Sequence, residues 1–209
     1  MGTETTAPPK GTITDKRLMR GARSRKVVLE RAVDVASLEG LDNISFGGLA
    51  ADTGLSKAGI QALFKTKEAL QLATVEFARE LFIDAVIRPA RPVPRGAARL
   101  RALVENFITY IHKPLLPGGC FRVANLADFD SRPGPIRDAL FSDQRKWFDI
   151  LAAELRKAVE AEEIEPLDIE LAVFQIDSVL CAANTALRGG DTDALDKVRR
   201  TVENLLKSP

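Results

Sequence analysis

The stretch FGGLAADTGLSKAGIQALFK, from Phe46 to Lys65, decides the fold, because it has the residue pattern of a helix-turn-helix. Ala50 is small where the first helix has to approach the second closely. Gly54 follows four residues later, where the sharp turn between the helices needs a positive φ. Ser45 and Ser56 each precede a helix, where a hydroxyl caps free backbone N–H groups. A unit of this kind typically places its second helix in the major groove of DNA.

The composition is that of a soluble globular protein. The 209 residues are 45% hydrophobic and 28% charged, and no apolar run approaches the roughly 20 residues that span a bilayer. The N-terminal residues are polar and lack the apolar core of a signal peptide, so we expect a cytoplasmic protein. Two cysteines and one histidine make no metal-binding pattern, and we expect neither a metal nor another cofactor.

Positive charge gathers at the N-terminal end. Residues 1–67 hold 11 Lys or Arg against 7 Asp or Glu, a net of +4, whereas the rest of the chain has a net of −3. A basic cluster beside a helix-turn-helix attracts a polyphosphate partner. We expect residues 1–22 to form a flexible basic arm. The basic residues of the arm and of the helix after it are Lys10, Lys16, Arg17, Arg20, Arg23, Arg25 and Lys26.

Helical periodicity runs through the chain, and no segment alternates like a strand, so the sequence predicts an all-α fold of about nine helices. A three-helix head over residues 23–68 would carry the helix-turn-helix. A body over residues 69–209 would bind ligand and dimerise. The helices expected outside the helix-turn-helix lie within residues 24–39, 67–87, 95–111, 120–128, 135–161, 166–190 and 193–207.

The last two helices are apolar over a broader surface than one neighbouring helix covers. One seam of the helix within 166–190 includes Ile176, Val179 and Ala183, and a second seam beside it includes Leu171 and Phe174. Packing against a second copy in a four-helix bundle would bury the excess, and an ordinary internal core is the alternative. The residues expected at the dimer interface are Ile176, Val179, Ala183, Val198, Val202 and Leu205.

From Arg25 to Glu76 the chain resembles the DNA-binding region of the tetracycline-repressor (TetR) family of bacterial transcription regulators. The matching segments are RKVVLERAVDVASLEG and NISFGGLAADTGLSKAGIQALFKTKEAL. The resemblance implies three helices in a DNA-binding head and the others in a ligand-binding, dimeric body. Family members commonly have a tyrosine and a histidine where this chain has Gln61 and Leu63. Gln61 therefore either replaces the tyrosine at a phosphate or pairs with an adenine edge.

An enzyme is the main alternative, and its candidate groups are poorly placed. His112 ends an amphipathic helix, and Cys120 has no histidine partner near in sequence to lower its pKa. Cys181 completes no motif, while Asp128 and Asp130 precede a turn that they are expected to cap. We therefore predict a protein that is not an enzyme. A helix-turn-helix that serves only as a protein-binding adapter is the third possibility.

The sequence thus predicts a homodimeric, ligand-responsive DNA-binding regulator, a repressor or an activator, and a repressor is favoured. It would be released from a palindromic double-stranded operator by a small hydrophobic effector. The helix that begins at Lys67 would act as a lever through Phe77 and Leu81. The residues expected at DNA are Arg25, Ser45, Ser56, Lys57, Ala58, Gln61, Ala62, Lys65 and Lys67. Those expected at the ligand are Phe107, Tyr110, Cys120, Phe121, Asn125 and Trp147.

Overall fold

The computed structural model describes residues 11–207, and over this range it consists of helices and connecting loops without a strand. The predicted all-α fold class is confirmed, with nine α-helices in the described residues. The elements in chain order are α1 (Gly11–Glu39), η1 (Leu41–Asn43), α2 (Phe46–Thr53), α3 (Lys57–Phe64), α4 (Lys67–Phe82), η2 (Ile83–Ile87), η3 (Arg88–Ala90), α5 (Ala97–His112), α6 (Phe121–Phe129), α7 (Pro135–Glu160), α8 (Ile169–Arg188) and α9 (Ala194–Leu205).

Three hydroxyl caps define where the helices of the head begin. The Ser45 Oγ accepts a hydrogen bond from the Gly48 N–H at 3.0 Å, and the Ser56 Oγ accepts one from the Gly59 N–H at 3.1 Å. Thr66 caps α4 in the same way, with its Oγ1 3.1 Å from the Ala69 nitrogen. Gly54 ends α2 with a φ of 71°, which confirms the expected left-handed turn. The boundaries of α2 and α3 therefore follow from interactions within four residues.

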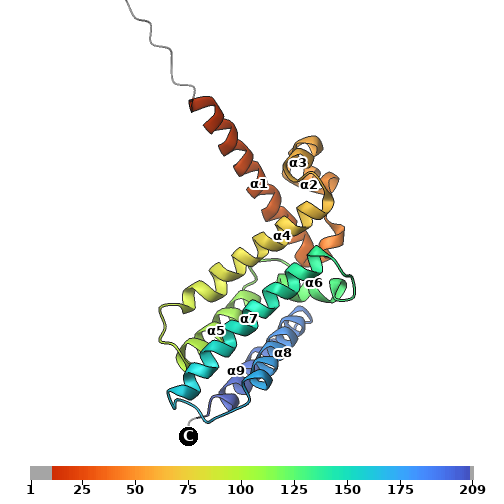
Figure 1. The fold of residues 1–209 in the computed structure, drawn as a ribbon. Coiled ribbons are helices and arrows are strands. Elements are labelled where there is room, and N and C mark those ends of the chain that lie inside the picture. The colour runs from red at the N-terminus through yellow and green to blue at the C-terminus, as the bar shows by residue number, and fades with distance from the viewer. Residues whose placement is uncertain (1–10, 208–209) are drawn as a thin grey trace, which may run out of the picture.

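Helix α1 begins much earlier than the sequence pattern indicates. It starts at Gly11 rather than near Ser24, so residues 11–22, expected in a flexible arm, belong to a helix. No proline lies between Pro9 and the end of α1 at Glu39, so no residue in this stretch lacks the backbone N–H that a helix interior needs. The exposed side chains of Leu18 and Met19 lie on this extension, which projects beyond α2 and α3 in Figure 1. The first ten residues of the expected arm lie outside the described residues.

The core of the head is continuous with the body. Val28, Ala32 and Ala36 of α1 are fully buried and pack in one cluster with Leu49 of α2 and Ile60 of α3. The same cluster extends through α4 into the neighbouring body helices, α6 and the first turns of α7. The boundary expected after residue 68 lies inside α4, which runs from the head down the side of the body in Figure 1. Helix α4 is therefore shared by both parts.

The body is a helical bundle around a second core. Its cluster joins α5, α7, α8 and α9, and Phe107, Leu151, Leu155, Ile176 and Leu180 are fully buried at its centre. Figure 1 shows α8 and α9 packed together at one edge of this bundle, with α4 on the opposite side. Among the described residues, α8 alone is long and apolar enough to cross a bilayer, contrary to the expectation that no segment would be. Its buried face packs on α7 and α9 as part of the core.

Candidate nucleic-acid interface and ligand cavity

One face of α3 is anchored and the other is open to solvent. Ile60 and Phe64 are buried in the core of the head, with exposed fractions of 0% and 3%. The remaining side chains of this short helix are mostly small or polar and lie on the outer face. This open face includes four of the residues that the sequence analysis expected at DNA: Lys57, Ala58, Gln61 and Ala62.

The other five residues expected at DNA differ in the contacts that they already make within the protein. Ser45 and Ser56 use their oxygens as caps, which leaves each hydroxyl proton free to donate. Lys65 is exposed and has no ion-pair partner in the described part of the chain. Lys67 donates from its Nζ to the carbonyl oxygen of Asp42 at 2.6 Å. Arg25 is anchored to the end of α3, with its guanidinium 4.5 Å from the centre of the Phe64 ring.

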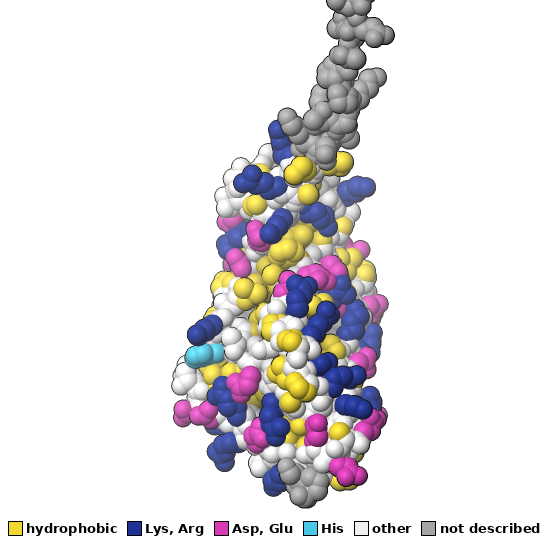
Figure 2. Space-filling view, turned by 90° about the vertical axis from the view of Figure 1, so that its left-hand side faces the viewer, with side chains coloured by type: hydrophobic (Ala, Val, Ile, Leu, Met, Phe, Trp, Pro, Cys, Tyr) yellow, Lys and Arg dark blue, Asp and Glu magenta, His cyan; other side chains and the backbone are white. Residues whose placement is uncertain are grey.

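A backbone feature at the end of α3 was not predicted. Lys65 has a φ of 64° and a ψ of −57°, and the Thr66 N–H donates to the carbonyl oxygen of Phe64 at 2.7 Å. This is a γ-turn with positive φ, a strained conformation for a residue with a side chain. Lys and Arg side chains surround this end of the molecule, next to the grey N-terminal residues in Figure 2. The turn fixes where a basic side chain leaves the helix.

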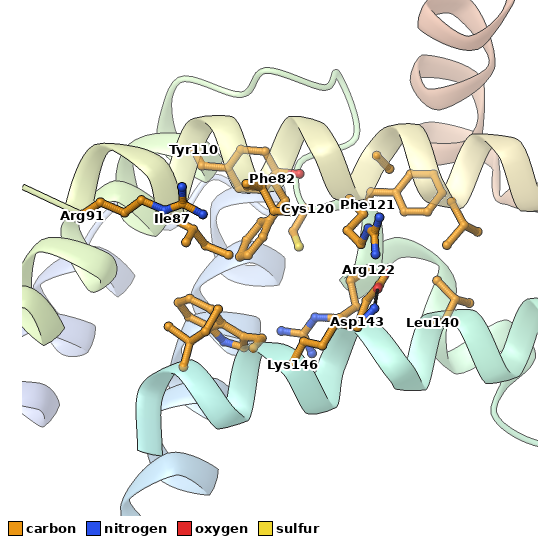
Figure 3. Close-up of a pocket in the computed structure, with 16 residues that line it drawn as sticks. Phe82, Ile87, Arg91, Tyr110, Cys120, Phe121, Arg122, Leu140, Asp143 and Lys146 are labelled. Atoms are coloured by element: carbon orange, nitrogen blue, oxygen red, sulfur yellow. Dashed lines mark hydrogen bonds and ion pairs between the residues drawn. The ribbon is translucent and has the colours of Figure 1, made fainter. Parts of the chain in front are cut away.

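A cavity of about 210 Å³ lies in the body. Its walls come from α4, η2, α5, α6 and α7, and Figure 3 shows the α4 and α7 side chains facing each other across it. Most of the wall is apolar. The lining residues are Val75, Ala78, Arg79, Phe82, Ile83, Ile87, Arg91, Tyr110, Cys120, Phe121, Arg122, Leu140, Asp143, Lys146, Trp147 and Ile150.

Aromatic rings form one side of the cavity. Phe82 contacts Trp147 edge to face, with ring centres 5.3 Å apart, and meets Tyr110 in the same way at 5.7 Å. Phe107 stacks on Trp147 with centres 6.1 Å apart and does not line the space itself. The rings support one another, so this wall is preformed rather than assembled around a ligand.

A buried ion pair closes the cavity on the α6 side. Arg122 of α6 donates from its Nη2 to the Asp177 carboxylate of α8 at 2.6 Å, and Trp147 donates from its indole nitrogen to the same oxygen at 3.1 Å. Burial raises the pKa of the Cys120 thiol. Burial and the nearby Asp177 carboxylate raise the pKa of Cys181 to about 12. Neither thiol therefore has the lowered pKa that is typical of an activated cysteine nucleophile.

Four of the six residues expected at the ligand line this cavity, namely Tyr110, Cys120, Phe121 and Trp147. Phe107 lies behind Trp147, and Asn125 lies elsewhere. The buried side chain of Asn125 accepts from the Leu41 N–H at 2.7 Å and donates to the Ala36 carbonyl oxygen at 3.1 Å, so it holds α6 against the head. The prediction missed the charged lining residues on α4, α6 and α7 and in the loop after η3. They are Arg79, Arg91, Arg122, Asp143 and Lys146.

The lever residues are shifted by one position. The cavity is lined by Ala78 and Phe82 of α4 rather than by Phe77 and Leu81. The predicted pair packs against the cluster that joins α1, α4 and α6. The two residues of each pair are four positions apart, and Leu81 is a surface neighbour of Ala78 on the helix. Helical periodicity alone therefore does not tell which of the two pairs faces the cavity.

The residues expected between two copies are instead inside one copy. Ile176, Ala183, Val198 and Val202 are at most 2% exposed, because α8 and α9 bury them against each other and the bundle. Val179 and Leu205 are half-buried in the same core. The second seam of α8 is the one left open, where Leu171 and Phe174 are 52% and 64% exposed. We call this surface the α8 stripe; it consists of Leu171, Phe174, Gln175, Ser178, Ala182 and Thr185.

The candidate catalytic groups are scattered. His112 is exposed at the end of α5, and Asp128 and Asp130 are exposed at the end of α6. No three His, Cys, Asp or Glu side chains converge on a metal-sized site within residues 11–207. The two candidate binding features of the described residues are the exposed face of α3 and the preformed cavity in the body.

Solved structures share this fold. A transcriptional regulator from Chloroflexus aurantiacus matches with a TM-score of 0.80 at 21% identity, over 90% of this chain and 94% of its own. A protein from Saccharomonospora viridis, solved with choline, matches with a TM-score of 0.74 at 18% identity, over 88% and 95%. AibR, solved with isovaleryl coenzyme A and operator DNA, matches at 0.72 and 19%, over 87% and 97%. No curated protein sequence matches the chain.

The family follows from the body of the chain. The family description "Tetracyclin repressor-like, C-terminal domain" matches residues 96–202, which is half of the chain. A helical body of this type behind a helix-turn-helix head defines a class of transcription regulators. The chain belongs to the tetracycline-repressor family, which confirms the resemblance drawn from residues 25–76.

Proposed function

We propose that the chain is a cytoplasmic, homodimeric repressor that leaves its operator when a small apolar effector fills the cavity. The observation that carries this proposal is that α4 and α6 each contact both the head and the cavity. Helix α4 starts one residue after the γ-turn at Lys65 and reaches the cavity at Phe82. Helix α6 lines the cavity through Phe121 and holds the head through Asn125.

On the DNA side, α3 enters the major groove with its open face toward the bases. Lys57 and Gln61 have the reach to meet base edges, while Ala58 and Ala62 allow close approach and contact thymine methyl groups. Ser45, Ser56, Lys65 and Lys67 flank this helix and are suited to phosphate oxygens. Arg25 supports the end of α3 and adds positive charge there.

Two copies are needed to read a palindromic site. The α8 stripe exposes two large apolar side chains, Leu171 and Phe174, and it runs along 15 residues of one helix face, from Leu171 to Thr185. Packing it on its counterpart by a two-fold axis buries Leu171 and Phe174 and sets two recognition helices at a fixed distance. Operator binding needs that distance to match one turn of DNA, about 34–36 Å.

Release follows from a change in that distance. An effector that packs between α4 and α7 shifts α4 at Phe82 and α6 at Phe121, and both helices carry the shift to the head. The effector only has to bind the mismatched arrangement better, since a coupling of about 1–3 kcal/mol lowers DNA affinity by about 5- to 150-fold. DNA weakens effector binding by the same factor.

The test begins with selection of genomic DNA fragments by the purified protein at moderate salt. We expect one enriched palindrome, with affinity falling steeply between about 50 and 200 mM salt because Lys and Arg release counterions. The Lys57→Glu variant, altered only on the open face of α3, is the control for specific binding.

A second experiment tests release. An effector found by thermal shift is titrated into free and operator-bound protein. A failure to enrich any sequence refutes the repressor and favours the protein-binding adapter, and equal effector affinities refute the release mechanism alone.

A further inference from the structure

We infer that the effector is a compact apolar acid, with its carboxylate held by the cations of the cavity wall. This inference rests on the proposed function, because it names the chemical class of the ligand for the same cavity. It starts from the charged side chains that line an otherwise apolar space. Four of them are cations, from α4, the loop after η3, α6 and α7, and one is a carboxylate. They are Arg79, Arg91, Arg122, Lys146 and Asp143.

Two of these cations keep unused capacity toward the cavity. Arg79 contacts Glu76 and Glu80 through its Nη2, on the exposed side of α4, while its Nε–H is buried and has no hydrogen-bond partner. Arg91 has no carboxylate within ion-pair distance in the described part of the chain. In Figure 3 its side chain extends along the wall toward Ile87. A buried N–H without a partner is costly, and an anionic ligand removes that cost.

The other charged groups are already matched in pairs. Asp177 accepts from both Arg122 and Trp147, so its charge is neutralised before a ligand arrives. Lys146 lies 3.4 Å from Asp143, and its side chain is 56% exposed, so it is free to turn toward a second carboxylate. A ligand carboxylate placed between α4 and α7 therefore meets Arg79 and Lys146 and has Asp143 as its only facing anion.

A cationic ligand is disfavoured by the same geometry. It meets an excess of positive charge, because four cations and one carboxylate line the cavity. A neutral ligand fits the apolar wall but leaves the Arg79 Nε–H unpaired.

The size of the cavity limits the apolar part of the ligand. Its volume of about 210 Å³ lies below the roughly 300–1,000 Å³ of drug-sized sites, so the apolar part is a short chain or one ring. Phe82, Ile83, Ile87, Trp147 and Ile150 provide the surface against which it packs. A chain of about eight carbons is a suitable probe for this space.

The experiment compares three probes with the same tail and different head charge: octanoate, 1-octanol and octyltrimethylammonium. Trp147 is the only tryptophan of the chain and lines the cavity, so its fluorescence reports occupancy directly. We expect octanoate to bind at least tenfold more tightly than octanol, and the ammonium probe to bind most weakly. Equal affinities for octanoate and octanol, tighter binding of the ammonium probe, or no octanoate binding at millimolar concentration would each overturn the inference.

Variants separate charge recognition from general damage. Arg79→Met and Lys146→Met keep the apolar stems, and each should weaken octanoate about tenfold while leaving octanol unchanged. Arg88→Met is the matched control, because Arg88 pairs with Asp84 on the surface and does not line the cavity. Unchanged octanoate affinity in both lining variants would refute the assignment of the carboxylate to these cations.

Operator release is measured with the same probes, which separates this inference from the proposed function. Octanoate that binds in the cavity without weakening operator binding would show that the cavity accepts an apolar acid, and it would overturn the inference that the effector belongs to this class. If octyltrimethylammonium releases the operator and octanoate does not, the proposed repressor function is supported and the inference of an anionic effector is overturned.

Discussion

The open face of α3 and the α8 stripe differ in the largest side chains that they present to solvent. The outer face of α3 has Lys57, Ala58, Gln61 and Ala62, which are small or polar. The α8 stripe exposes Leu171 and Phe174 by half or more. A polar face loses little in water and gains most beside a polyanion, whereas an apolar stripe gains by contact with another apolar surface. The comparison indicates DNA for α3 and a second copy of the chain for α8.

The largest effect should distinguish the open side of α8 from the buried seam between α8 and α9. Val202→Glu places a charge where the side chain is 2% exposed, which should cost on the order of 3–5 kcal/mol of unfolding free energy in the protomer. Phe174→Glu places the same charge on the α8 stripe. We expect it to leave the protomer folded and monomeric, with operator affinity reduced by on the order of 100-fold because only one head binds at a time.

Urea unfolding and light scattering measure the two effects separately. Thr109→Glu, at an exposed position on α5, controls for an added surface charge. A folded and fully dimeric Phe174→Glu protein with normal operator affinity would show that the interface lies elsewhere. A stable monomeric Val202→Glu protein would restore the interface expected from the sequence.

A smaller effect tests the face of α3. Gln61→Ala should change the preferred base at one position of each half-site, by about 1–3 kcal/mol if Gln61 pairs with adenine. Lys65→Gln, at the end of the helix, should weaken all sequences about equally and reduce the salt dependence by about one phosphate contact. Binding to a library of operator variants at two salt concentrations measures both. If Gln61→Ala weakens every sequence alike, Gln61 is a phosphate contact.

The difference between the two helices also explains what the sequence predicted. The limits of α2 and α3 depend on Ser45, Gly54 and Ser56, each of which acts within four residues, so the head was readable locally. Helix α8 is apolar on two adjoining faces, and only the positions of α7 and α9 decide that Ile176 is buried while Phe174 is open. Tertiary packing made that choice, so residues predicted at the interface, such as Ile176, are buried within one copy of the chain.

The cavity shows the same limit. Of its aromatic lining residues, Tyr110, Phe121 and Trp147 were predicted and Phe82 was missed. Arg79 was missed because Glu76 and Glu80 stand beside it and give the local pattern of a solvated surface. The signal that was available is that Arg79 and Lys146 neighbour lining apolar residues, such as Ala78 and Trp147, on their helices.

The smallest effect concerns the one carboxylate that lines the cavity. Burial raises the pKa of Asp143, and the nearby Lys146 and Arg79 offset this only in part. A carboxyl group whose pKa is higher in the folded state than in the unfolded state favours folding when it is protonated, and this contribution is lost as pH rises through the folded-state pKa. The Asp143→Asn variant should therefore be more stable than the parent at pH 7, by up to about 1 kcal/mol, and the difference should shrink as pH falls toward 4.

The lost pair with exposed Lys146 works against this gain in stability but contributes less than about 1 kcal/mol. Urea unfolding at both pH values measures the effect, with Asp149→Asn, on the exposed face of α7, as the control. A variant less stable than the parent at pH 7 would show that Asp143 is held as a needed counter-charge, and the case for an anionic effector beside it would weaken accordingly.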